Sequence, residues 1–133
     1  RKLALALIES NADLRCVWTA GKLNDTNLAI DHCFPWSRWR NNDLWNLLPA
    51  TDKANNSKSD KLPSAPLMES SKPAITRWWQ EGYLQSPSSE SFWVQAKAAL
   101  PFSEQLSDVD GLFDAMCLQR AVLRKNQRLE EWR

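Results

Sequence analysis

The chain has 133 residues, of which 43% are hydrophobic and 25% charged, and its formal net charge is +1. This composition is typical of a folded globular protein with one modest core, and it excludes an intrinsically disordered chain. The apolar stretch LALALI at residues 3–8 is far shorter than the roughly 18 residues that a membrane span needs, so we expect a soluble protein.

The cysteines indicate a reducing compartment. They are Cys16, Cys33 and Cys117, an odd number at wide spacing with no C-x-x-C pair. Neither a disulfide framework nor a structural zinc site is indicated, and each thiol reads as an inert, buried or half-buried side chain. We therefore expect a cytoplasmic protein.

The first part of the chain predicts a short helix followed by a β-hairpin. Residues 2–10 have a loose apolar pattern that reads as a helix. Residues 14–19 and 28–32 are short β-type runs, and the turn-rich sequence GKLNDTN at 21–27 lies between them. Two short strands with such a connection favour a hairpin.

An ordered loop and a short helix are expected next. Residues 33–46 show no periodic pattern, and Pro35 together with a polar RNND cluster favours a loop. Three tryptophans could hold this loop, namely Trp36, Trp39 and Trp45. Thr51 is a suitable N-cap for a helix that reaches about Lys58, and Asp52 suits the first turn of that helix. Asn and Ser are weak helix formers, so we expect these positions to serve something other than helix stability.

The rest of the chain predicts a connector and three helices. Residues 63–73, PSAPLMESSKP, are rich in Pro and Ser and read as the connector. Helices are expected at 74–84, 88–100 and 107–132. The last of them carries an apolar stripe typical of a core-facing side, formed by Leu112, Met116, Val122, Leu123 and Leu129.

Two basic segments stand out within a nearly neutral chain. LQRAVLRKNQR at residues 118–128 carries four basic residues and no acid, and SRWR at 37–40 alternates arginine with tryptophan. Each segment could contact a phosphate backbone, or it could be an ordinary solvated face.

The only histidine lies where the expected strand at 28–32 ends. His32 directly follows Asp31 and precedes Pro35 by three residues. A neutral imidazole near pH 7 can take a proton from a water molecule that attacks a phosphodiester. A single histidine at a strand end is most often structural, so residues further along the chain decide between the two readings.

Residues 30–64 support the catalytic reading. They contain IDHCFPWS at 30–37 and NDLWNLLPATDKANNSKSDKLPS at 42–64, in the order of the motif of HNH endonucleases, which have a ββα-metal core. The chain resembles this family, and it is particularly similar to the variant in CRISPR RNA-guided nucleases whose last motif histidine is an asparagine. The resemblance implies an α+β fold. Its core would be a β-hairpin, an ordered loop and a short helix, surrounded by additional, mostly C-terminal helices.

The resemblance also implies a role for each motif residue. His32 would be the general base, while Asp31 and Asn55 would be ligands of one metal ion. Oxygen ligands suit Mg²⁺ or Mn²⁺ rather than zinc. Asn46 would hold the loop in place, so that the histidine is correctly aimed.

Several assignments around this motif stay open. Asn56 is adjacent to Asn55, and counting back from the KSD sequence favours Asn55 as the ligand. Lys58, Arg38 and Arg40 are candidates for contacts with nucleic-acid phosphates. Because no C-x-x-C pair flanks the motif, we expect the core to be held by packing rather than by a zinc knuckle.

We expect one HNH nuclease domain over residues 1–133, with the ββα-metal core at about 14–62 and a helical extension at about 74–133. It would be the catalytic module of a longer protein. The resemblance implies hydrolysis of double- or single-stranded DNA in a prokaryotic CRISPR-type or restriction defence system, with a larger targeting protein or RNA-guided complex as partner. The alternatives are a binding module of the same fold that cuts poorly, and an RNA-cleaving nuclease.

Overall fold

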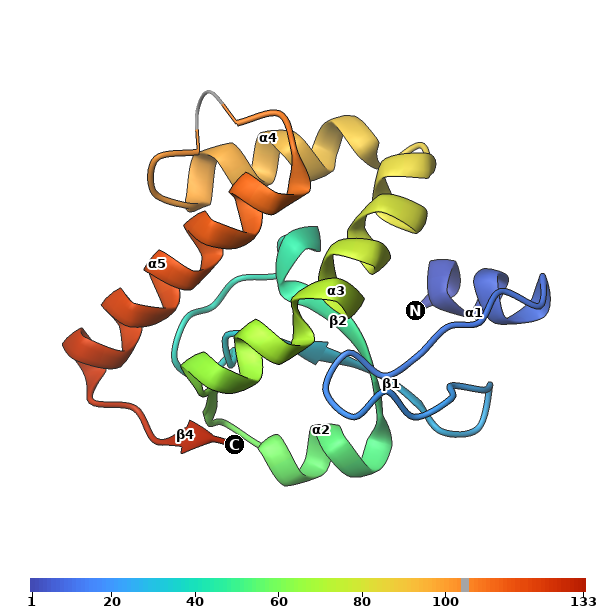
Figure 1. Ribbon diagram of the computed structural model, residues 1–133, viewed down its shortest axis with the longest axis horizontal. Coiled ribbons are helices and arrows are strands. Elements are labelled where there is room, and N and C mark those ends of the chain that lie inside the picture. The colour runs from blue at the N-terminus through green and yellow to red at the C-terminus, as the bar shows by residue number, and fades with distance from the viewer. Residues whose placement is uncertain (104–105) are drawn as a thin grey trace.

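Strand β1 (Leu28–His32) pairs antiparallel with β2 (Leu47–Thr51), and helix α2 (Asp52–Lys58) follows β2 directly in the computed structural model (Figure 1). The structure describes residues 1–103 and 106–133. In the register of this sheet His32 is opposite Leu47 and Leu28 is opposite Thr51. The fold is α+β, and the strand–loop–strand–helix unit is its ββα core.

The hairpin predicted between residues 14–19 and 28–32 is wrong. The first segment forms turns and a single β-bridge between Arg15 and Lys22, and the true partner of β1 lies beyond the loop at 33–46. The segment at 14–19 reads as a strand because its apolar side chains are buried, but its backbone winds against the sheet, where Val17 N–H donates to the carbonyl of Pro49 at 3.1 Å.

The loop and the start of α2 follow the prediction. Residues 33–46 form no strand, and only their last residues make a short 3₁₀ helix, η1 (Leu44–Asn46). Thr51 caps α2, since its hydroxyl oxygen accepts a hydrogen bond from the N–H of Ala54 at 3.1 Å. The pairing partner β2 was not predicted, because LLPAT is too short and contains a proline. Proline is tolerated here because a two-stranded sheet consists of edge strands only.

The Pro/Ser-rich connector predicted at 63–73 is wrong. Helix α3 (Ala65–Glu81) includes most of it and continues through residues 74–81 of the helix predicted at 74–84. Ser64 caps this helix, and Pro66 lies in its first turn, where a missing N–H costs nothing. Pro73 lies inside the helix, which continues past it because the buried face runs on both sides. That face consists of Met68, Ser71, Ile75, Trp78 and Trp79.

The other predicted helices are confirmed with altered ends. They are α1 (Lys2–Glu9), α4 (Ser89–Ala99) and α5 (Val109–Gln127), and a second 3₁₀ helix, η2 (Tyr83–Gln85), follows α3. Helix α5 ends before Arg128, which adopts a left-handed conformation with φ 53°. The chain then forms β4 (Glu131–Trp132), parallel to β3 (Leu62–Pro63). In the described part of the chain, no helix is both long enough and apolar enough to cross a membrane.

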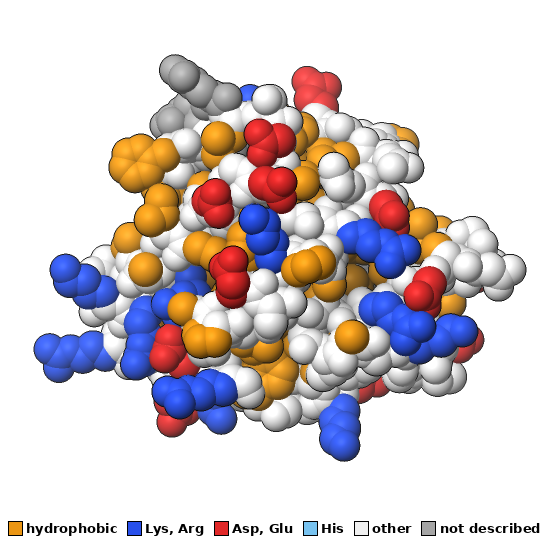
Figure 2. All heavy atoms as spheres, in the orientation of Figure 1, with side chains coloured by type: hydrophobic (Ala, Val, Ile, Leu, Met, Phe, Trp, Pro, Cys, Tyr) orange, Lys and Arg blue, Asp and Glu red, His pale blue; other side chains and the backbone are white. Residues whose placement is uncertain are grey.

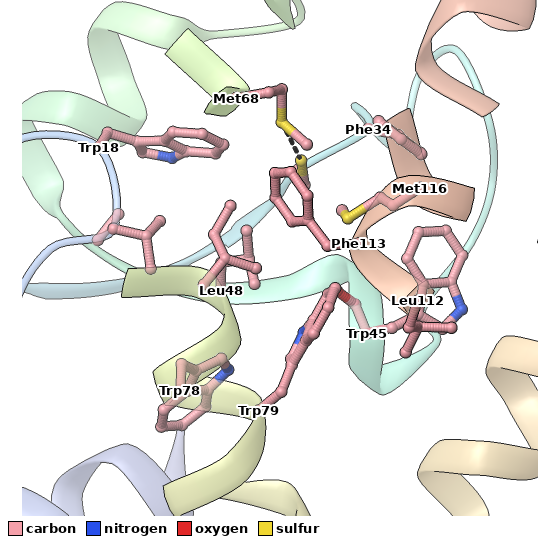
Figure 3. Packing of buried hydrophobic residues seen from close by; sticks show 14 of the residues in the cluster. Trp18, Phe34, Trp45, Leu48, Met68, Trp78, Trp79, Leu112, Phe113 and Met116 are labelled. Carbon is pink, nitrogen blue, oxygen red and sulfur yellow. Dashed lines mark hydrogen bonds between the residues drawn. The ribbon is translucent and has the colours of Figure 1, made fainter. Parts of the chain in front are cut away.

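Helices α3 and α5 pack their apolar faces against the ββα core (Figure 3). The largest fully buried side chains include Trp45 before β2, Leu48 within it and Trp79 on α3. Two indole N–H groups of α3 also donate to main-chain carbonyls, Trp78 to Leu47 at the start of β2 at 3.0 Å and Trp79 to Trp45 in η1 at 3.2 Å. The helices therefore fix the end of the loop by hydrogen bonds as well as by packing.

The basic segment in the C-terminal helix is only partly available to a ligand. Arg120 is buried and bonds the carboxylate of Glu131 at 2.7 Å, and Arg124 lies 3.8 Å from the same carboxylate. Lys125 and Arg128 are exposed. In Figure 2 positively charged side chains gather near the end of α5, while acidic side chains are interspersed over the rest of that face. Of the expected apolar stripe, Leu112, Met116 and Leu123 are buried on α5, whereas Val122 is 45% exposed and the buried Leu129 lies beyond the end of the helix.

Candidate active site

His32 is the last residue of β1, and its imidazole is held by the following loop. The side chain is half-buried, and Nε2 lies 2.7 Å from Oδ1 of Asn42. When this amide oxygen accepts, Nε2 carries the proton and Nδ1 keeps a free lone pair. The loop at 33–46 thus provides an acceptor for one ring nitrogen, the side-chain carbonyl of Asn42.

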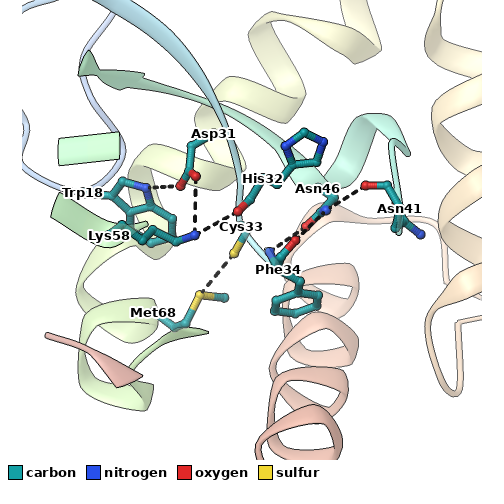
Figure 4. A network of polar contacts seen from close by, with 9 residues as sticks. All are labelled: Trp18, Asp31, His32, Cys33, Phe34, Asn41, Asn46, Lys58 and Met68. Carbon is teal, nitrogen blue, oxygen red and sulfur yellow. Dashed lines mark hydrogen bonds and ion pairs between the residues drawn. The ribbon is translucent and has the colours of Figure 1, made fainter. Parts of the chain in front are cut away.

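Asp31 lies on β1 next to His32 but its carboxylate is buried, with only 3% of the residue exposed. The indole N–H of Trp18 donates to Oδ2 at 2.8 Å, and Nζ of Lys58 lies 3.4 Å from Oδ1 (Figure 4). Burial raises the pKa of the Asp31 carboxyl, and the nearby Lys58 charge and the Trp18 hydrogen bond oppose that rise. The carboxylate is thus held by one neutral and one charged donor.

Lys58 is fully buried at the end of α2, not at the surface where a phosphate-binding residue was expected. Besides Asp31, its ammonium donates to the main-chain carbonyl of His32 at 2.8 Å (Figure 4). In this arrangement the ammonium has no face for a phosphate. It joins α2 to the end of β1, where both site residues lie.

Asn46 is completely buried and closes the loop that follows β1. Its Oδ1 accepts from the N–H of Phe34 at 2.8 Å, and its Nδ2 donates to the carbonyls of Phe34 at 3.2 Å and Asn41 at 3.1 Å. Its own main-chain carbonyl accepts from Cys33 N–H at 2.9 Å. These bonds connect the two ends of the loop. Such a connection is what we expected of Asn46, whose role would be to hold the loop in place. Its effect on catalysis stays a prediction.

The two candidate asparagines of α2 differ in environment. Asn55 is half-buried and lies three residues before Lys58, so the two side chains share one side of the helix. Asn56 is exposed and lies two residues before Lys58, a spacing that points it away from that side. The helix geometry therefore favours Asn55 as the residue directed toward β1.

The loop arginines lie at the surface. Arg38 is anchored, because its guanidinium lies 3.2 Å from the carboxylate of Asp60 and its carbonyl accepts from Gln127 at 3.0 Å. Arg40 is exposed. Of the three predicted phosphate contacts, these two are the ones that face solvent.

The chemistry of two expected ligands suits a hard divalent cation, since carboxylate and amide oxygens, as in Asp31 and Asn55, are donors that Mg²⁺ and Mn²⁺ prefer. In the structure the two carboxylate oxygens of Asp31 are bonded to Trp18 and Lys58, and Lys58 belongs to the helix that carries Asn55. Among residues 1–103 and 106–133, no three His, Cys, Asp or Glu side chains gather into a metal-binding group. A site built on these residues would rely on one carboxylate and one amide, and a cation there would share Asp31 with Lys58.

Two residues of this site were missed by the sequence interpretation. Trp18 was assigned to a strand, although its indole holds the Asp31 carboxylate. Asn42 was treated only as part of a polar loop cluster, although it holds the His32 ring. Neither shows a distinctive sequence signal, because both contacts depend on how distant segments fold together.

Comparison with known proteins supports the motif. Residues 16–64 match a family model described as HNH endonuclease, and this range contains β1, the loop, β2 and α2. No curated protein matches the chain.

The buried ion pair can be tested by a double-mutant cycle on Asp31 and Lys58. Asp31→Asn leaves a buried ammonium without its counter-charge, and Lys58→Met leaves a buried carboxylate. Each single change should lower the free energy of unfolding by about 3–5 kcal/mol, and the double variant should lose less than the sum. Urea unfolding measures all four proteins.

The matched control is the exposed pair of Arg38 and Asp60, whose side chains are 45% and 53% exposed. The cycle of Arg38→Met and Asp60→Asn should give a coupling below about 1 kcal/mol. Additive effects of the Asp31 and Lys58 variants would contradict a coupled buried pair.

Asn42→Ala should impair catalysis without impairing the fold. Asn42 is exposed, so the free energy of unfolding should change by less than about 0.5 kcal/mol. Loss of the bond that orients the imidazole should lower the rate of phosphodiester cleavage by roughly 10- to 100-fold, the cost typical of losing an orienting partner. Asn126→Ala, an exposed asparagine on α5, is the control. Equal cleavage rates for the two variants would show that Asn42 does not orient the base.

Proposed function

We propose that this chain, whose residues 16–64 match a family model described as HNH endonuclease, is a metal-dependent endonuclease domain that hydrolyses DNA phosphodiester bonds. The observation that best supports this proposal is the setting of His32. One ring nitrogen is bonded to Asn42 at 2.7 Å, and the other keeps a lone pair on a half-buried ring. An imidazole held in this way suits a general base.

In the proposed reaction His32 takes a proton through Nδ1 from the water molecule that attacks phosphorus. The bond between phosphorus and the 3′ oxygen breaks, and this oxygen takes a proton from solvent, so the products carry a 5′-phosphate and a 3′-hydroxyl. Asn42 keeps the ring oriented during proton transfer. Asn46 keeps the loop closed, and Lys58 fixes the main chain of His32 through its 2.8 Å hydrogen bond.

Asp31 and Asn55 would hold one Mg²⁺ or Mn²⁺ ion, which when bound would stabilise charge on the phosphate and on the leaving oxygen. Trp18 orients the Asp31 carboxylate through its 2.8 Å hydrogen bond. Arg38 and Arg40 would contact phosphates outside the scissile bond.

We further propose that residues 1–133 form one domain and act as the catalytic module of a longer cytoplasmic protein. With one site, the domain would nick a single strand. A prokaryotic CRISPR-type or restriction defence system is the proposed setting, in which a targeting protein or an RNA-guided complex would bring the domain to DNA.

Nuclease assays on three substrates test the proposal. Supercoiled plasmid, single-stranded DNA and single-stranded RNA are incubated with the protein in Mg²⁺, Mn²⁺ or EDTA. We expect cutting of DNA that needs the metal and falls at least about 100-fold in His32→Ala, the lower range for loss of a general base. Asn55→Ala should lose activity, while Asn56→Ala, its exposed neighbour, should keep it.

The outcomes separate the alternatives. Cutting that is undiminished in His32→Ala contradicts the base assignment. Faster cutting of RNA than of DNA supports the RNA nuclease, and binding of DNA without cutting in either metal supports the binding module.

Metal affinity provides a second test, because Lys58 lies beside the proposed ligand Asp31. Its positive charge opposes a divalent cation at the same carboxylate. Lys58→Gln should therefore bind Mn²⁺ about tenfold more tightly than the unchanged protein, which is about 1.4 kcal/mol. Isothermal titration measures the dissociation constant, and Lys53→Gln, an exposed lysine of the same helix, is the control. Equal affinities of both variants would contradict a cation at Asp31.

A further inference from the structure

Trp36 is an exposed tryptophan that lies beside the candidate base His32. Of the eight tryptophans, all within the described residues, the other seven are buried or half-buried, while Trp36 is 45% exposed. Its ring centroid lies 5.9 Å from that of His32, with the ring planes inclined by 55°. An indole that is 45% exposed beside the candidate base buries only part of its ring, so packing alone does not explain its position.

The backbone around Trp36 is well fixed. Pro35 before it is buried, and the Pro35 carbonyl accepts from the N–H groups of Arg38 at 2.9 Å and Trp39 at 3.0 Å. Trp39 packs into an aromatic cluster with Phe34, at a centroid distance of 5.9 Å. The exposed indole is thus carried by a rigid turn. A ligand that contacts this ring would not have to order a flexible loop.

Two arginines follow this tryptophan closely in the sequence. Arg38 and Arg40 follow it at the surface, and the ion pair between Arg38 and Asp60 holds one of them in place. An exposed aromatic ring combined with arginines is the combination that binds single-stranded nucleic acid, since the ring stacks on a base and the cations contact phosphates.

We propose that Trp36 is a stacking platform for an unpaired nucleobase next to the scissile phosphodiester. This inference rests on the proposed nuclease function and names its substrate more narrowly, as DNA that is single-stranded or locally opened at the cut. A paired base in a duplex is stacked on its neighbours and does not offer a free face to the indole. The arginines would bind the phosphates of the same strand.

A binding assay in EDTA, which prevents cutting, tests this platform. The probes are a fluorescein-labelled oligothymidylate of 20 nucleotides and an abasic deoxyribose-phosphate chain of the same length and charge. One base stacked on an aromatic ring corresponds to roughly 5- to 150-fold in affinity. We expect the unchanged protein to prefer the oligothymidylate by at least about fivefold, and Trp36→Ala to lose that preference while binding the abasic chain as before.

Two further variants control for structural effects. Trp36→Phe keeps an aromatic face and should keep most of the preference. Phe102→Ala removes an 82% exposed ring that follows α4 and should bind like the unchanged protein. Thermal unfolding should give the same midpoint for both Trp36 variants, because the side chain is exposed.

A cutting assay then connects the platform to the reaction. A single-stranded oligonucleotide with one mapped cut is prepared with an abasic site at each position in turn. One abasic position beside the cut should slow the unchanged protein and leave Trp36→Ala unaffected. If Trp36→Ala keeps the preference for bases, or if the unchanged protein has none, the platform is refuted while the nuclease proposal stands. If the protein neither binds these probes nor cuts plasmid, the nuclease proposal itself fails.

Discussion

The buried contact between Lys58 and Asp31 is the interaction on which the candidate site depends. An ammonium and a carboxylate can remain charged in a protein interior only when both are paired and hydrogen-bonded. Lys58 meets this condition by reaching Asp31 at 3.4 Å and the carbonyl of His32 at 2.8 Å. Because the lysine belongs to α2 and both acceptors belong to β1, the helix cannot slide or rotate against the strand without leaving a charge unpaired. The pair therefore sets the position of the Asn55 helix relative to His32.

The parts of the fold that could be predicted are those governed by local sequence. The strand at 28–32 follows from its β-type run, and the start of α2 follows from the side chain of Thr51. The partner of β1 could not be found in the same way, because pairing with β2 joins segments separated by a loop whose closure depends on Asn46. Proline misled the interpretation in α3, where tertiary burial on both sides of Pro73 outweighs the local cost of proline within a helix.

In the candidate site, too, local sequence predicts only part of the structure. The spacing of the motif indicates which residues to consider, but not the directions of their side chains. Lys58 was a candidate for a phosphate contact, and a lysine is seldom fully buried. Its burial can be understood only once Asp31 and the carbonyl of His32 are known to face α2. Asn42 and Trp18 contact the site from a loop and a turn, where sequence periodicity carries no information.

The last strand, β4, connects the C-terminal part of the chain to the residues that hold Asp31. Trp132 on β4 packs edge-on against Trp18 at a centroid distance of 6.0 Å, and its indole N–H donates to the hydroxyl of Ser57 on α2 at 3.3 Å. The family match ends at residue 64, yet a side chain from the far end of the chain supports the indole that holds Asp31. The ββα core therefore depends on contacts from outside the matched range. Transplanting residues 16–64 into another scaffold would require a substitute for Trp132 as well.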